Sequence, residues 1–182
     1  MLIFSDTNEQ SYIIVKRNYI LNHKYFSYNE CLTSIDEYAT KLILEDRIPD
    51  LIVGVGTGGL VPAVLLANKF NIKVVNLGIR SRNAVNGTIQ EVANIYQDVD
   101  WDEFPDVKNV LVVDDLYDTG YTLIEIYEHL KDCGKEITFY TILLGEKHPV
   151  DDIIRDKFEY SKKFNNKDTW IDFFFEKQTP EK

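Results

Sequence analysis

The sequence contains no apolar run long enough to cross a bilayer. Its longest apolar stretches, such as Ile52–Val55 and Val110–Val113, have the length of a strand, whereas a membrane helix needs roughly 20 such residues. The first residues show no basic segment followed by an apolar one, so we expect no secretory signal. The two cysteines, Cys31 and Cys133, are too few for a disulfide framework or a cysteine-based metal site. These absences predict a cytoplasmic protein without a membrane partner.

Positive charge is also scarce, because 20 Lys and Arg residues stand against 30 Asp and Glu residues and the net charge is −10. A general nucleic-acid binder needs clustered Lys and Arg against the phosphate backbone, so nucleic acid is not an expected partner. A phosphorylated small molecule is compatible with this charge, since backbone N–H groups and Mg²⁺ can hold phosphates without net basicity.

The 182 residues, of which 45% are hydrophobic, have the size of one α/β domain with a short appendage, and they contain no internal repeat. After a short β element, apolar strand patterns alternate with amphipathic helix patterns. This alternation predicts a parallel twisted sheet flanked by helices, with the ligand beyond the carboxyl ends of the strands. The expected strands are Leu51–Val55, Lys73–Ile79, Asn109–Val113 and Glu136–Leu144. The expected helices run from Ser27 to about Glu45, over Gly59–Phe70 and over Tyr121–Asp132.

Local signals support these boundaries. Ser27 and Glu30 have the spacing of a capping box, and the first helix is expected to place Ile35, Tyr38, Leu42 and Ile43 on one face. Gly134 is expected just after the third helix. We therefore predict a single domain over residues 1–182. It includes an N-terminal β extension (1–25), a long polar flap (80–100), typical of a functional or disordered loop, and a C-terminal hood (145–176).

The most informative segment is Val110–Thr122, in which an apolar strand is followed by three acids and the start of a helix. Asp114 and Asp115 come at the expected strand end, and Asp118 lies in the following turn. The turn and the helix N-terminus offer backbone N–H groups and a positive dipole end, which suit a terminal phosphate. The acids can accept hydrogen bonds from sugar hydroxyls or bind Mg²⁺. The pattern predicts a ribose-phosphate site that also includes Thr119, Gly120, Tyr121 and Thr122.

A simpler interpretation is that Asp118 and Thr119 only cap the helix and that the acid pair is solvated. The complete order of strand, acids, turn and helix favours the phosphate site. Two other acidic motifs fit poorly. The Asp-Asp-x-x-Asp motif of prenyl-diphosphate enzymes lies on a helix, and the haloacid-dehalogenase-like Asp-x-Asp motif is absent from this strand end, where Leu116 and Tyr117 stand in place of the second acid.

A glycine-rich loop, Gly54–Gly59, joins a strand to a helix and matches the Gly-x-Gly-x-x-Gly dinucleotide fingerprint. A dinucleotide site would need an acid at the end of the next strand, but Val75–Ile79 contains none. The loop residues alone leave open a pyrophosphate loop, a dinucleotide loop and a plain tight turn. Arg80 and Arg82 follow in the flap and could add positive charge or remain solvated.

The end of the chain carries groups suited to a flat base. Trp170 can stack on such a base, although core packing is the commoner role of a tryptophan. Lys147, after a strand end, can donate a hydrogen bond to an exocyclic carbonyl oxygen.

Three segments together resemble one family. Val110–Thr122 resembles the phosphoribosyl-pyrophosphate motif of type I phosphoribosyltransferases. Gly56–Pro62 resembles the pyrophosphate loop of the xanthine-guanine members, with Thr57 in place of their basic residue. Asp168–Ile171 matches their Asp-Thr-Trp-Ile. The resemblance covers roughly Pro49 to Glu176 and is closest to xanthine-guanine and hypoxanthine-guanine phosphoribosyltransferases.

The resemblance implies a role for each segment. Asp114 and Asp115 would contact the ribose hydroxyls and Mg²⁺, the loop backbone would hold the 5′-phosphate, and Asp118 would accept the proton of the purine. The implied pyrophosphate-binding residues are Gly56, Thr57, Gly58, Gly59, Arg80 and Arg82. The implied base-binding residues are Trp170, Ile171 and Lys147, the last about two positions from the lysine of the family.

The expected reaction is transfer of phosphoribosyl from 5-phosphoribosyl-1-pyrophosphate to guanine, xanthine or hypoxanthine, with Mg²⁺ as cofactor and pyrophosphate as product. The resemblance also implies a homo-oligomer. Two other classes stay open: a regulatory protein that binds the sugar pyrophosphate without transfer, and an NAD-dependent oxidoreductase that uses the glycine loop.

Overall fold

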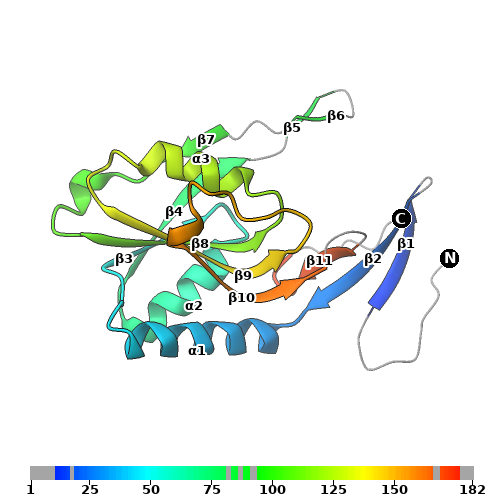
Figure 1. Cartoon of the computed structure of the whole chain (residues 1–182), viewed down its shortest axis with the longest axis horizontal. Helices are drawn as coiled ribbons and strands as arrows, with labels where there is room; N and C mark the ends of the chain where they lie inside the picture. Colours follow the sequence, from blue (N-terminus) through cyan, green and yellow to red (C-terminus); the bar gives the residue numbers. More distant parts are fainter. Residues whose placement is uncertain are drawn as a thin grey trace.

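The computed structural model describes residues 11–16, 19–80, 83–85, 88–90, 94–165 and 169–176. Within them, a six-stranded sheet has the order β10-β9-β8-β3-β4-β7 (Figure 1). Neighbouring strands are parallel except for β7, which pairs antiparallel with β4 at one edge. The predicted parallel sheet is therefore confirmed, with an antiparallel edge strand added. The strands are β3 (Leu51–Val55), β4 (Lys73–Arg80), β7 (Asn94–Gln97), β8 (Asn109–Tyr117), β9 (Glu136–Gly145) and β10 (Phe158–Phe164).

Helices cover both faces of this sheet. In Figure 1, α1 (Tyr28–Leu44) and α2 (Leu60–Phe70) lie below the sheet and α3 (Tyr121–Leu130) lies above it. Successive residues of β3 alternate between the two cores, since Ile52 packs in the cluster of α1 and α2 while Leu51 and Val53 pack in that of α3. A strand buried on both faces reads as a continuous apolar run, which is why the sequence identified β3 correctly.

The first helix begins as predicted. The Oγ of Ser27 accepts a hydrogen bond from the N–H of Glu30 (3.2 Å), and the N–H of Ser27 donates to Oε2 of Glu30 (2.8 Å), so the capping box is confirmed. The expected apolar face was wrong at one position, because the Ile43 side chain is 56% exposed. The 3.6-residue period rotates Ile43 away from the buried stripe.

The chain leaves the two central strands in opposite directions. From β3 it continues through α2 to β4, and from the neighbouring β8 it continues through α3 to β9 on the other side. Such a switch point opens a crevice at the carboxyl ends of the strands, which is where open α/β sheets bind ligands.

A smaller sheet joins the two ends of the described chain. Its order is β1-β2-β11, formed by β1 (Ser11–Lys16), β2 (Tyr19–Phe26) and β11 (Thr169–Phe173). The N-terminal β element is thus present, and β2 pairs parallel with β11 of the expected hood. A hydrogen bond between Nδ1 of His23 and Oδ2 of Asp172 (2.8 Å) links the two strands. Part of the expected hood, β10, belongs to the main sheet instead.

The expected flap is more regular than its sequence suggests. Within it, Asn94–Gln97 form β7, and β5 (Asn83–Val85) pairs with β6 (Thr88–Gln90) antiparallel. Arg82 lies outside the described residues. Short 3₁₀ helices follow at Trp101–Glu103 and Arg155–Lys157. In the part of the chain described here, no helix is both long and apolar enough to span a membrane.

Candidate functional site

A cavity of about 520 Å³ lies at the carboxyl ends of the parallel strands. Its walls come from the loop after β3, the end of β8 and the loop into α3, the turn after β9, and β11. Most of the predicted site residues meet here although they are far apart in sequence. Those that line the cavity are Gly56, Thr57, Gly58, Asp114, Asp115, Asp118, Thr119, Gly120, Tyr121, Thr122, Lys147, Trp170 and Ile171.

One predicted residue, Gly59, is placed differently, and the side chain of another, Arg80, lies outside the described part of the structure. Gly59 is found outside the described cavity lining and lies against the backbone of β8, where a Cβ would collide with the carbonyl of Val113 and the Cα of Asp114. Gly59 therefore serves the packing of α2 against β8. For Arg80 the structure describes the backbone at the end of β4.

The acid pair lies within β8, which is longer than the sequence predicted. Pairing with β3 stops at Val113, but pairing with β9 continues through Asp114 to Tyr117. Beside the acids, β8 is therefore paired with β9 on one side and no longer with β3 on the other, and both acids line the cavity. Asp114 is only 8% exposed, and its Oδ1 accepts a hydrogen bond from the N–H of Asp115 (2.9 Å).

Burial makes both carboxyls unusually weak acids. It raises the pKa of Asp114 well above its usual range, and the neighbouring charge of Asp115 adds to the effect. Burial also raises the pKa of Asp115 to about 6, and the carboxylate of Glu176 contributes to this rise. Carboxylates in such a setting gain most from a cation or from hydroxyl donors brought by a ligand.

Glu176 is a cavity residue that the sequence did not single out. It follows β11 and accepts a hydrogen bond from the N–H of Phe173 (3.2 Å). Burial raises its own pKa, and the charge of Asp172 acts in the same direction. The pairing of β11 with β2 helps to bring this acid to the cavity, so the local sequence showed only an acid at the end of the expected hood.

Replacing Glu176 by glutamine is expected to lower the pKa of Asp115 below about 6, because one of the negative charges that raise it is removed. Burial, the larger cause, stays in place, so the pKa should remain above the ordinary aspartate value. NMR titration of ¹³C-labelled carboxyl groups measures the shift. Glu146→Gln, at an exposed carboxylate beside Lys147, is the matched control and should leave the pKa of Asp115 unchanged.

The same variant should change stability with a defined sign. Since the pKa of Asp115 in the folded protein lies above its unfolded value of about 3.9, ionisation of Asp115 disfavours the folded state as the pH rises from about 4 to about 6. Glu176→Gln should therefore raise the melting temperature more at pH 7 than at pH 4. An equal change at both pH values would contradict the electrostatic link.

The loop into α3 leaves the helix N-terminus open to the cavity. Gly120 is the N-cap with φ of +86°, and the described structure gives it no side-chain cap. Neither Asp118 nor Thr119 therefore occupies the N-cap position, which belongs to Gly120. A Cβ at Gly120 would collide with the ring of Tyr117, so this position requires glycine.

The glycine loop after β3 also lines the cavity, through Gly56, Thr57 and Gly58. Its helix, α2, starts at Gly59 without a side-chain cap in the described structure and, like α3, has no acidic residue in its first turn. By contrast, α1 starts away from the cavity with a complete capping box. A Cβ at Gly58 would collide with the carboxylate of Asp115, so the loop and the acid pair lie side by side.

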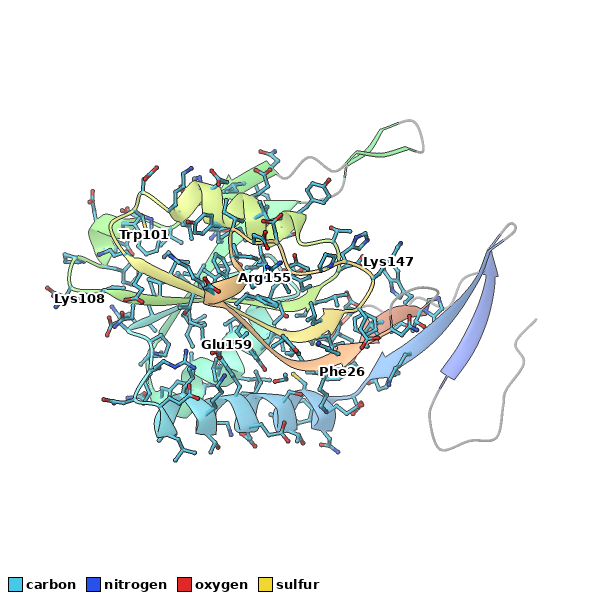
Figure 2. The ribbon with its side chains drawn as sticks, viewed as in Figure 1. Phe26, Trp101, Lys108, Lys147, Arg155 and Glu159 are labelled. Atoms are coloured by element: carbon cyan, nitrogen blue, oxygen red, sulfur yellow. The ribbon has the colours of Figure 1, made fainter. Side chains whose placement is uncertain are left out.

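The hood side of the cavity carries an exposed aromatic ring. Trp170 is 45% exposed and lines the cavity, so its role is not core packing. Ile171 is buried in the core, which holds β11 in place beside the cavity. Figure 2 shows Lys147 on the loop after β9, at the end of the main sheet nearest β11.

The residues of this cavity match a known family. The model of the phosphoribosyl transferase domain family matches residues 24–175, most of the chain and all of the cavity residues named above except Glu176. The chain belongs to the phosphoribosyltransferase family. It is a pentosyltransferase with the type I fold, and the interpretation of the glycine loop as an NAD site is set aside.

Relatives and solved structures agree with this membership. The phosphoribosyltransferase is 34% identical to a xanthine-guanine phosphoribosyltransferase of Idiomarina loihiensis, over 67% of this chain and 68% of the relative. It is 28% identical to a hypoxanthine-guanine phosphoribosyltransferase of Schizosaccharomyces pombe, over 85% and 89%. The crystal structure of a purine phosphoribosyltransferase from Pyrococcus horikoshii superimposes with a TM-score of 0.65 at 26% identity, covering 88% of this chain and 98% of that one.

Proposed function

We propose that this phosphoribosyltransferase transfers the phosphoribosyl group of 5-phosphoribosyl-1-pyrophosphate to a 6-oxopurine. The products would be the nucleoside monophosphate and pyrophosphate. The observation that carries the proposal is one cavity in which the N-terminus of α3 and the glycine loop before α2 lie beside an acid pair, with Trp170 on the opposite part of the lining, from β11. The names of the relatives, which act on guanine, xanthine or hypoxanthine, support the choice of base.

The 5′-phosphate binds at the loop into α3. The unpaired N–H groups of the first turn and the positive end of the helix dipole attract an anion there. Thr119 and Thr122 line this part of the cavity and add hydroxyl donors. Gly120 lets the phosphate approach the backbone closely.

The ribose binds beside the acid pair. Asp114 and Asp115 accept hydrogen bonds from its hydroxyls, and this stabilises the charged form of two carboxyls whose pKa values are raised by burial. In the described residues, no cluster of three or more His, Cys, Asp or Glu side chains forms a complete metal cage. The acid pair still fits Mg²⁺, which proteins commonly hold through one or two carboxylates together with substrate phosphates.

The pyrophosphate binds at the loop of Gly56, Thr57 and Gly58. Bound Mg²⁺ would neutralise the charge of this leaving group. Because Thr57 stands where other members carry a basic residue, the loop offers its backbone N–H groups at this position, and Arg80 and Arg82 would add positive charge.

The base binds on the hood side. Trp170 stacks on the purine ring, the backbone of Ile171 contacts its edge, and Lys147 donates to the 6-oxo group. Asp118, in the turn between the ribose and base subsites, accepts the proton that the purine nitrogen loses. Nearby carboxylates stabilise the positive charge that develops on the ribose ring.

The test is an assay of phosphoribosyl pyrophosphate and Mg²⁺ with guanine, xanthine, hypoxanthine, adenine and a pyrimidine base in parallel. We expect nucleotide from at least one 6-oxopurine and little or none from the others. No product from any 6-oxopurine would overturn the substrate proposal. Calorimetric binding of phosphoribosyl pyrophosphate with no turnover on any base would instead favour a regulatory binding protein.

A further inference from the structure

Asn76, in β4, lies beside the glycine loop. Two backbone carbonyls face the end of its side chain, those of Gly56 at 2.8 Å and Gly54 at 3.0 Å. Both are acceptors only, so the atom that faces them must be the amide nitrogen, which donates to each. Asn76 is half-buried and is absent from the described residues that line the cavity. It therefore holds the backbone of the loop without lining the cavity itself.

Hydrogen bonds hold the two peptide groups on either side of Gly56. The N–H of Gly56 donates to the carbonyl of Leu77 (2.8 Å), and the carbonyl of Gly56 accepts from Asn76. In a planar trans peptide the carbonyl and the following N–H point in opposite directions. The N–H of Thr57 consequently points away from Asn76, and Thr57 itself lines the cavity.

We propose that Asn76 is a positioning residue for the leaving pyrophosphate. It orients the Gly56–Thr57 peptide so that the N–H of Thr57 serves as a donor to the pyrophosphate, in place of the basic side chain that this loop lacks. The inference rests on the proposed function, because it requires pyrophosphate at this loop. The two carbonyl acceptors also explain why an amide suits position 76. An ionised carboxylate at this position would face the same two oxygens without a proton to donate.

The test compares two ligands that share a phosphate but differ in the pyrophosphate. Isothermal calorimetry with Mg²⁺ would measure phosphoribosyl pyrophosphate and ribose 5-phosphate on the wild type, Asn76→Ala and Asn76→Asp. We expect Asn76→Ala to bind phosphoribosyl pyrophosphate about 10-fold more weakly and Asn76→Asp to bind it more weakly still. Affinity for ribose 5-phosphate should stay unchanged, because that phosphate belongs to the loop into α3.

Asn109→Asp, at an exposed asparagine at the start of β8, makes the same chemical change away from the cavity and should affect neither ligand. For Asn76→Asp, the affinity relative to wild type should recover as the pH falls, since a protonated carboxyl can again donate. Equal weakening of both ligands, or unchanged affinity for phosphoribosyl pyrophosphate, would overturn the positioning role. A wild-type protein that fails to bind phosphoribosyl pyrophosphate would overturn the proposed function instead.

Discussion

Replacing Asp118 by asparagine is expected to lower kcat by about 10²–10⁴-fold, the usual contribution of a positioned proton acceptor. The substitution preserves the size of the side chain but removes its ability to take a proton from the purine. Asp118 lines the cavity in the turn between β8 and α3, within the segment proposed to hold the sugar phosphate. Steady-state kinetics with the preferred base would measure the loss, and calorimetry would show that phosphoribosyl pyrophosphate still binds.

The matched control is Asp132→Asn, an exposed aspartate just beyond the other end of α3. This variant should keep full activity. If Asp118→Asn loses phosphoribosyl pyrophosphate affinity in proportion to kcat, then Asp118 acts in ribose binding rather than as the proton acceptor.

The main sheet could be predicted because its signals are local. A strand buried on both faces, such as β3, is a continuous apolar run, and the start of α1 is marked by a capping box four residues long. The edge strand β7 was missed for the opposite reason. Its pattern is polar and largely exposed, and only its pairing with β4 makes it a strand.

In the site, too, some features have local sequence signals and others depend on pairing between distant segments. Adjacent acids after an apolar strand and glycines before a helix are signals within a dozen residues, and parallel strand order brings them to one edge of the sheet. The extension of β8 beyond Val113 depends on β9, which continues to pair after β3 has ended. The position of Glu176 depends on β2 pairing with β11, a contact between opposite ends of the chain. Such long-range pairings leave no periodic trace in either segment.

Removing the ring of Trp170 should have the second large effect. Trp170→Ala is expected to raise KM for the base by roughly 5- to 150-fold, which corresponds to about 1–3 kcal/mol for the loss of one stacking contact. Because the ring is exposed at the cavity rather than packed in the core, the free energy of unfolding should change little. Trp170→Phe keeps a smaller ring and should recover part of the affinity.

The chain offers its own control, since it contains two tryptophans. Trp101 lies in a 3₁₀ helix and packs against the core on the α3 side of the sheet, so Trp101→Phe should leave KM for the base unchanged. This variant also isolates the fluorescence of Trp170, which a stacked purine nucleotide should quench, whereas Trp170→Phe should abolish that quenching. If Trp170→Ala instead raised KM for phosphoribosyl pyrophosphate and left KM for every base unchanged, the hood would contact the sugar pyrophosphate and the base would bind elsewhere in the cavity.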